Sequence, residues 1–316
     1  MDKLSVIIPF LNEGDEVRAT LESLRTTSGE EVEVYLIDDA STDGYDYQQA
    51  ACDYDAHYIR HEERRGVAAS RDEAIARCAT DYFLLLDAHM RFTSRTWTRQ
   101  LLDALRSDRR AIWCAQTAVM WKDATGHIEH PKRRTTYGAF IDFDLASWHA
   151  WWNYHDPAPN STTADIAVVL GAAYATNRPY WERLGGLAGL RTYGMDEQFI
   201  SAKTWMEGGR CRLLKDIVVE HLYRKQFPYP MDGYPTTYNS LLLSELLLEG
   251  EMQERFIDRT IRHGKRETVI RAMEDLVAQE KEINTYKQQL RAIQSRPFEE
   301  FVTLNRKGEN DKRKKC

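Results

Sequence analysis

The stretch YFLLLDAHM, residues 82–90, carries an aspartate and a histidine two positions apart at the end of an apolar run. Residues i and i+2 of an extended segment point to the same face, so Asp87 and His89 can bind one ion together. His221 in VVEHLYRK also follows an apolar run and is a third candidate ligand. One carboxylate and two imidazoles, completed by diphosphate oxygens and water, suit an octahedral divalent cation such as Mn²⁺ or Mg²⁺. Alternatively, Asp87 caps a turn and both histidines are ordinary packed, hydrogen-bonded side chains.

Two pairs of adjacent acids are further candidates. Asp38 and Asp39 end a second apolar run, with no Lys or Arg nearby to pair with them. Asp39 can accept a hydrogen bond from the imide N–H of a nucleobase, or it belongs to an N-cap or Asx-turn. Asp196 and Glu197 begin a helical stretch. Acids in a first helical turn are often caps favoured by the helix dipole, but one of these two can instead deprotonate an acceptor hydroxyl.

Two single residues also stand out by their surroundings. Arg71 in GVAASRDEA can bind a phosphate through both of its terminal nitrogens. The alternative is a surface ion pair with Glu73 or Asp72. Gly171 in VLGAAYA is a place where the backbone can approach a ligand closely, or a β-bulge.

The elements that must position these side chains alternate between strands and helices. Apolar runs predict strands over 3–10, 31–41 and 81–89, and helical spacing predicts helices over 12–27 and 66–79. This order predicts an α/β fold with a mostly parallel sheet covered by helices. Because ligands bind beyond the carboxyl ends of such strands, the polar residues that follow the three strands are expected to converge on one crevice.

The second half of the chain has weaker signals. The middle, roughly 110–165, is rich in aromatic residues and His but carries few regular patterns, and a strand is predicted over 165–176. Short helices and one or two strands follow. Two highly charged helical stretches, 240–256 and 267–294, predict a helical extension. Packing on the core or on another subunit is expected for it, with contact to a membrane surface as the alternative.

Composition excludes several classes of protein. The net charge of -6 argues against a general nucleic-acid binder, and 42% hydrophobic residues indicate an ordinary globular protein. Five Cys without a CxxC pair favour a reducing compartment over a disulfide framework or a zinc cluster. Charged residues near the N-terminus interrupt the apolar run before it reaches the length of a signal peptide, and no stretch approaches the ~20 apolar residues of a membrane span. A cytoplasmic location, with at most surface association with a membrane, is therefore expected.

The motifs together resemble the GT-A class of nucleotide-sugar glycosyltransferases, of the bacterial family-two type. SVIIPFLNE, LIDDASTDG, GVAASRDEAI and LLLDAH occur in the order and spacing of its nucleotide-binding half. The second half is similar to the polypeptide N-acetylgalactosaminyltransferases, which also have an Asp-x-His motif, a later His and an Arg-Lys-Gln…Pro-Tyr loop. The matching stretch is EHLYRKQFPYP. The resemblance covers about residues 3–230.

The resemblance implies a Rossmann-like GT-A domain over 1–235, with a nucleotide-binding half (1–110) and an acceptor and catalytic half (111–235). A helical extension with a basic tail occupies 236–316. The residues expected to contact the uridine or nucleotide are Pro9, Phe10, Asn12, Glu13, Asp39, Arg71 and Ala88. The metal ligands on the diphosphate would be Asp87, His89 and His221. Arg224 and Tyr229 would lie on a mobile loop that closes over the diphosphate, and Gly171 would face the donor sugar.

The departures from the resemblance bear on the mechanism. The transferases that act on polypeptides have Gly-Gly where this chain has Gly171-Ala172, and Glu-Asn where it has Asp196-Glu197. The bacterial inverting enzymes usually have Glu-Asp there, with the Asp as base. Glu197 occupies the base position with the order of the acids reversed, which favours inversion over retention.

The sequence therefore predicts a metal-dependent glycosyltransferase of glycan biosynthesis. It would move a hexosyl or N-acetylhexosaminyl group from a UDP-sugar to a hydroxyl of a glycan, lipid-linked or protein acceptor. One alternative is a non-catalytic UDP-binding scaffold whose helical extension recruits partners. A sugar nucleotidyltransferase is the other, but it needs a Gly-rich, Lys-bearing loop after the first strand, where PFLNEGDE has one Gly and no Lys.

Overall fold

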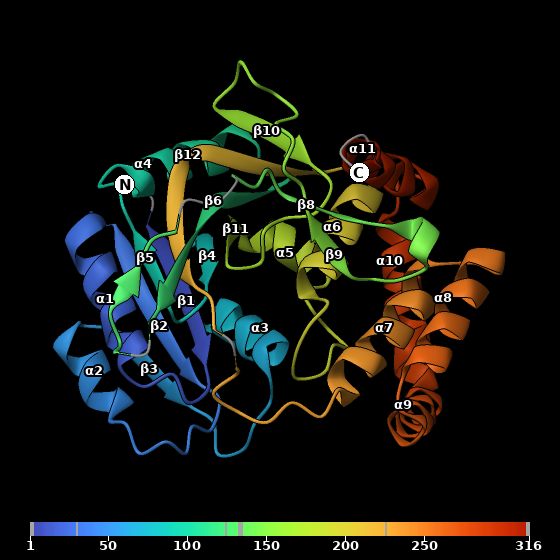
Figure 1. The fold of residues 1–316 in the computed structure, drawn as a ribbon, viewed down its shortest axis with the longest axis horizontal. Coiled ribbons are helices and arrows are strands. Elements are labelled where there is room, and N and C mark those ends of the chain that lie inside the picture. The colour runs from blue at the N-terminus through green and yellow to red at the C-terminus, as the bar shows by residue number, and fades with distance from the viewer. Residues whose placement is uncertain (1–2, 30, 124, 132–134, 225, 314–316) are drawn as a thin grey trace.

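A mixed sheet runs through the molecule, as the ribbon in Figure 1 shows. The computed structural model describes residues 3–313 except 30, 124, 132–134 and 225. The sheet has the strand order β10-β12-β6-β11-β4-β1-β2-β3. Its N-terminal strands are parallel to one another and comprise β1 (Leu4–Phe10), β2 (Val32–Asp38), β3 (His57–Arg60) and β4 (Tyr82–Leu86). The predicted α/β fold is confirmed, with parallel strands in the N-terminal part of the chain.

The second half of the chain extends the sheet with antiparallel and parallel pairs. β11 (Ala173–Asn177) is antiparallel to β4 and to β6 (Ala111–Lys122), whereas β12 (Arg210–Leu222) is parallel to β6. The shorter strands are β5 (Met90–Phe92), β7 (Ile128–Glu129), β8 (Ala139–Ile141), β9 (Ala150–Trp152) and β10 (Thr163–Ile166). β5 pairs with β12, and this pairing brings His221 opposite Met90, next to the Asp87–His89 segment.

Helices cover both faces of the sheet. Leu4, Val6 and Ile8 of β1 belong to one apolar core and Ile7 to the other, which explains why this strand is apolar along its length. The helices packed into the first core are α1 (Asp15–Thr27), α2 (Tyr47–Asp53) and α4 (Trp97–Ser107). Those packed into the second are α3 (Val67–Arg77), α5 (Arg178–Leu184) and α6 (Asp196–Glu207).

The C-terminal extension packs on the second core, as expected. Its helices are α7 (Tyr234–Leu247), α8 (Gly250–His263), α9 (Arg266–Ala278), α10 (Glu280–Ile293) and α11 (Phe298–Arg313). α7 buries leucines around most of its circumference, which is typical of a helix enclosed by the protein. The two helices predicted over 240–256 and 267–294 are each divided, at Leu248–Glu249 and at Gln279. Within the described residues, the helices are too short or too polar to cross a bilayer.

The structure differs from the sequence-based predictions in three further places. The strand predicted over 165–176 is interrupted, because residues 167–172 form a buried loop between β10 and β11 that places Gly171 beside α6. The middle of the chain contains β6, a strand of 12 residues. α2 and β3 were not predicted, because β3 is short and half-exposed and therefore has no apolar run.

Candidate active site

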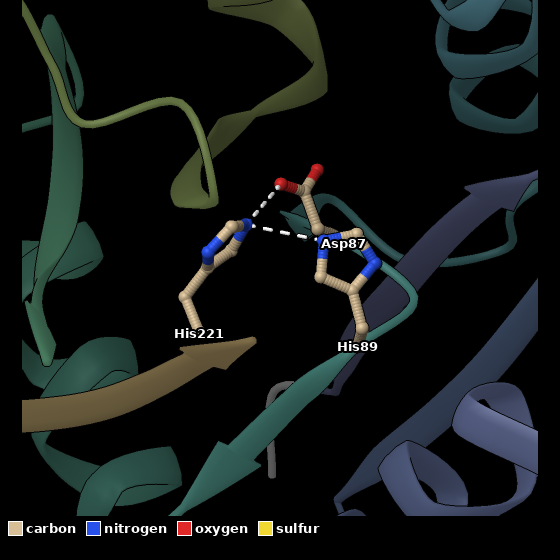
Figure 2. A group of neighbouring side chains, drawn as sticks. All are labelled: Asp87, His89 and His221. Atoms are coloured by element: carbon tan, nitrogen blue, oxygen red, sulfur yellow. Dashed lines mark hydrogen bonds and ion pairs between the residues drawn. The ribbon is translucent and has the colours of Figure 1, made fainter. Parts of the chain in front are cut away.

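The structure brings Asp87, His89 and His221 together at the carboxyl ends of β4 and β12 (Figure 2). Nε2 of His89 lies 3.2 Å from Nε2 of His221, and Nε2 of His221 lies 3.4 Å from Oδ2 of Asp87. One possible ligand atom from each residue lies within 4.8 Å of the other two. Ligand atoms from all three residues therefore meet at one point, as a cation site requires.

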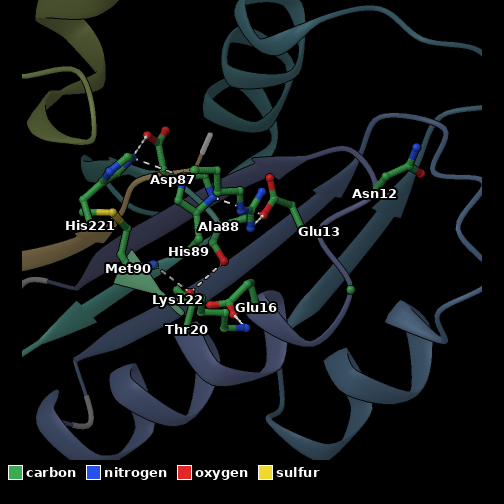
Figure 3. A network of polar contacts seen from close by, with 12 residues as sticks. Asn12, Glu13, Glu16, Thr20, Asp87, Ala88, His89, Met90, Lys122 and His221 are labelled. Carbon is green, nitrogen blue, oxygen red and sulfur yellow. Dashed lines mark hydrogen bonds and ion pairs between the residues drawn. The ribbon is translucent and has the colours of Figure 1, made fainter. Parts of the chain in front are cut away.

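Glu13 sets the orientation of His89, as Figure 3 shows. Its Oε2 lies 3.1 Å from Nδ1 of His89, and Arg224 donates to the same oxygen. With Nδ1–H directed at a carboxylate, the lone pair of His89 is on Nε2 and faces His221, which is the tautomer that a metal ligand needs. Burial raises the pKa of Glu13, but hydrogen bonds and charge from His89 and Arg224 outweigh it and lower the pKa below its usual value. Glu13 was expected in the uridine pocket; the structure shows that its carboxylate contacts His89.

The turn between Asp87 and Met90 is held from α1. The hydroxyl of Thr20 donates to the Ala88 carbonyl at 2.7 Å and accepts from the Met90 N–H at 3.0 Å (Figure 3). Asp87 N–H donates to the Ala172 carbonyl at 3.0 Å. Thr20 was not identified from the sequence, because nothing in an isolated helical threonine marks a contact with a strand end 68 residues later.

Asp38 and Asp39 both have partners, so the expectation that no basic residue lies near them is wrong. Asp38 is fully buried and pairs with Arg60. The carboxylate of Asp39 accepts the N–H groups of Arg65 and Gly66, both at 2.8 Å, and a ring nitrogen of His61 lies 2.9 Å from it. Asp39 therefore anchors the loop that precedes α3. Its contact with a nucleobase remains a prediction.

A cavity of about 330 Å³ lies over these strand ends. The expected site residues that line it are Pro9, Phe10, Glu13, Asp39, Asp87, Ala88, His89, His221, Arg224 and Tyr229. Tyr229 closes one side, with the Arg64 guanidinium 4.7 Å from its ring centroid. Asn12 does not line this cavity; its side-chain oxygen accepts the Thr42 N–H in the loop after β2. The cavity is thus formed jointly by the first half of the chain and by the loop that follows β12.

Arg71 is 2% exposed and lies beneath this cavity. Its guanidinium pairs with Asp196 and lies 3.3 Å from Oδ1 of Asp87 and 3.3 Å from the hydroxyl of Tyr174. The alternative of a surface ion pair is therefore wrong. The two carboxylates neutralise the guanidinium from inside the protein, so Arg71 supports the site from below.

Glu197 lies next to Gly171. A Cβ added to Gly171 would be 3.2 Å from the Glu197 carboxyl group, so glycine lets the loop approach this acid without displacing it. Burial and the neighbouring Asp196 carboxylate raise the pKa of Glu197 well above its usual value. Because Asp196 is bound by Arg71, Glu197 is the acid of this pair that is suited to exchanging a proton.

A second cavity, of about 770 Å³, is lined by β6, β12 and parts of residues 152–162. Tyr223 lines both cavities, and its ring centroid lies 4.3 Å from that of His221 and 5.5 Å from that of Trp152. A molecule held in the second cavity would therefore lie next to the three converging ligands.

Comparison with known proteins agrees with this geometry. Residues 5–178 match the family described as Glycosyl transferase family 2. The chain belongs to glycosyl transferase family 2. Polypeptide N-acetylgalactosaminyltransferase 10 of Rattus norvegicus is 30% identical to it over 240 residues, which are 71% of this chain and 38% of that protein. Polypeptide N-acetylgalactosaminyltransferase 14 of Homo sapiens is 26% identical over 245 residues, 74% of this chain and 43% of that protein. This family 2 chain spans less than half the length of these relatives.

Solved structures share the fold of this family 2 chain. GalNAc-T7, crystallised with UDP, GalNAc and Mn²⁺, aligns with a TM-score of 0.70 at 21% identity, over 86% of this chain and 54% of that one. S. aureus TarS 1–349, in complex with UDP-GlcNAc, aligns with a TM-score of 0.55 at 14% identity, over 98% and 92%. These likenesses confirm the predicted GT-A fold and the resemblance to N-acetylgalactosaminyltransferases.

Proposed function

We propose that this chain transfers a hexosyl or N-acetylhexosaminyl group from a UDP-sugar to an acceptor hydroxyl with the help of a divalent cation. The convergence of Asp87, His89 and His221 in the wall of a cavity at the carboxyl ends of the strands carries the proposal. A non-catalytic scaffold would not need an oriented His89 tautomer or a glutamate with a raised pKa beside the same strand end.

The donor set supports Mn²⁺ as the cation. Two imidazoles and one carboxylate offer mixed nitrogen and oxygen ligands, whereas Mg²⁺ in proteins is bound almost entirely through oxygen. Mn²⁺ is also present with UDP in the structure of GalNAc-T7, which shares this fold. A cation bound here would supply positive charge against the diphosphate leaving group, an effect worth several kcal/mol.

The residues of the chain would carry out the rest of the reaction. Glu197 would take the proton of the acceptor hydroxyl as the oxygen forms its bond to the anomeric carbon and the bond from that carbon to the diphosphate oxygen breaks. Arg71 holds Asp196 and leaves Glu197 as the proton acceptor. Direct attack by the acceptor inverts the anomeric centre, and we propose inversion on this basis.

The loop after β12 would exclude water from the donor. Arg224 donates to Glu13 and Tyr229 stacks with Arg64, so two side chains of this loop already contact the nucleotide-binding half. Both line the first cavity, where they would face a bound diphosphate. Such closure prevents hydrolysis of the activated sugar.

The acceptor would occupy the second cavity, because this hollow meets the first at Tyr223 beside His221. We further propose a cytoplasmic location, supported by the free thiols of Cys52, Cys78, Cys114 and Cys211.

Calorimetry of UDP binding with and without Mn²⁺ tests the cation site. We expect Mn²⁺ to tighten UDP binding in the wild type and Asp87→Ala or His221→Ala to abolish this gain, while the exposed His263→Ala keeps it. Turnover of a panel of UDP-sugars then separates enzyme from scaffold. UDP binding without slow Mn²⁺-dependent hydrolysis of any UDP-sugar would favour the scaffold.

A further inference from the structure

A buried polar side chain of β6 lines the second cavity. Gln116 is 5% exposed, and its side-chain N–H donates to the Thr136 carbonyl, which fixes the orientation of the amide. Its Oε1 has no hydrogen-bond partner within the described part of the chain. Buried polar groups are normally satisfied, so this oxygen points to a ligand with hydroxyl groups.

Aromatic rings accompany this polar side chain. Trp152, Tyr223 and Tyr137 line the same cavity, and the rings of Trp152 and Tyr223 are nearly perpendicular, at 71°. The C–H faces of a pyranose ring pack against such aromatic faces, while its hydroxyls point outward to polar groups. Aromatic faces with a few placed polar groups are the usual lining of a pocket for a small, polar organic ligand.

The charged groups of the wall are already paired. Lys215 lies 3.0 Å from Asp156, and His130 lies 2.7 Å from Glu220. These pairs offer hydrogen-bond donors and acceptors with little net charge, which suits a neutral polyhydroxylated ligand better than a charged one.

The wall of the second cavity includes an irregular stretch of β12. The register of β12 against β6 shifts between Leu214 and Val218, and this irregularity puts Lys215 and Asp216 on the cavity wall.

We infer that the second cavity binds a pyranose ring, and hence that the acceptor is a glycan. Trp152 and Tyr223 stack on the ring, and Oε1 of Gln116 accepts a hydrogen bond from one of its hydroxyl groups. That the ligand is the acceptor rests on the proposed function; that the cavity binds a sugar does not. A volume of about 770 Å³ falls within the range of about 300–1,000 Å³ of pockets for ligands of this size.

Saturation-transfer NMR on the full chain tests the sugar site. The probes are methyl hexosides and methyl N-acetylhexosaminides, with a Ser/Thr-containing decapeptide as competitor, each measured with and without UDP and Mn²⁺. We expect at least one glycoside to receive saturation and the peptide not to displace it. Gln116→Met, which keeps the size of the side chain but removes Oε1, should weaken its binding about 3- to 10-fold, as expected for one neutral hydrogen bond. Trp152→Ala should weaken it at least as much, and the exposed Gln288→Leu should not change it.

A second readout compares transfer with hydrolysis of the donor. In Gln116→Met the ratio of transfer to hydrolysis should fall by the same factor with the best glycoside as acceptor. Glycosides that fail to bind, or binding of the peptide that Gln116→Met and Trp152→Ala weaken, would overturn the inference. Failure of the proposed function looks different: no UDP-sugar would be turned over, while the glycoside would still bind without UDP and Mn²⁺.

Discussion

Replacing Glu13 with Gln should loosen the cation site without removing any of its three ligands. One oxygen of Glu13 faces both Nδ1 of His89, at 3.1 Å, and the guanidinium of Arg224. Glutamine keeps the size of the side chain but loses the charge that both neighbours use. Second-layer carboxylates of this kind typically account for about 10- to 100-fold in metal affinity, or about 1.4–2.8 kcal/mol.

The effect should depend on pH in one direction. The pKa of Glu13 is lowered in the folded protein, so its stabilising charge is fully present above the pKa of the unfolded chain, about 4.3. This contribution to stability disappears as the pH falls through the lowered, folded pKa. The difference in unfolding free energy between wild type and Glu13→Gln should therefore be full at pH 7 and shrink in acid.

Electron paramagnetic resonance of free Mn²⁺ at pH 7.5 measures the affinity directly. Glu16→Gln is a matched control, because Glu16 is also buried and pairs with Arg91 and Lys122, but has no contact with a histidine (Figure 3). We expect Glu16→Gln to change the affinity less than twofold. Equal Mn²⁺ affinity in wild type and Glu13→Gln, or an equal loss in both variants, would refute the orienting role of Glu13.

Three other perturbations have defined outcomes. Glu197→Gln should lower kcat at least 100-fold with unchanged UDP binding. Because the pKa of Glu197 is raised in the folded protein, the stability of the wild type should fall as the pH rises above about 4.3, the pKa in the unfolded chain. Urea unfolding midpoints at pH 5 and pH 8 should show this fall in the wild type and not in the variant. Burial lowers the pKa of Lys203 to about 7, so this lysine costs stability in full below that pH and progressively less as the pH rises to the unfolded value of about 10.4; Lys203→Met should therefore stabilise the fold more at pH 6 than at pH 10. Leu242→Ala in α7 should cost about 2–5 kcal/mol in urea unfolding.

The strands that could be predicted from the sequence are those with a long, unbroken apolar run. β1 and β4 are buried on both faces, so their apolar runs are unbroken and their ends are easy to place. β3 and α2 lack such runs, and missing them also hid Arg60 and His61, which bind Asp38 and Asp39 at the end of β2. The loop 167–172 was wrongly predicted as part of a strand, for the opposite reason. Val168, Val169 and Leu170 are buried and apolar, as strand residues often are, but they lie in a loop that approaches Glu197.

The same distinction applies to the site. Asp87, His89 and His221 were recognisable because each follows an apolar strand, and strand ends of one sheet meet at one edge. The contacts of Glu13 with Arg224 and of Arg71 with Asp196 join residues 211 and 125 positions apart. No local sequence pattern predicts contacts between residues so far apart in the chain, because these contacts depend on how the loop after β12 and the start of α6 pack on the sheet.

These two ion pairs have a consequence for how the site is assembled. Glu13 and Arg71 lie within residues 1–110, whereas Arg224 and Asp196 lie after residue 110, and each pair contacts one of the converging residues, His89 or Asp87. β12 pairs with β5, and this pairing brings His221 to the other two residues, again across residue 110. Residues 1–110 alone would hold only two of the three converging side chains, and Glu13 and Arg71 would lack the partners Arg224 and Asp196 that hold them in place. The arrangement of the three side chains therefore depends on contacts between residues 1–110 and the rest of the chain.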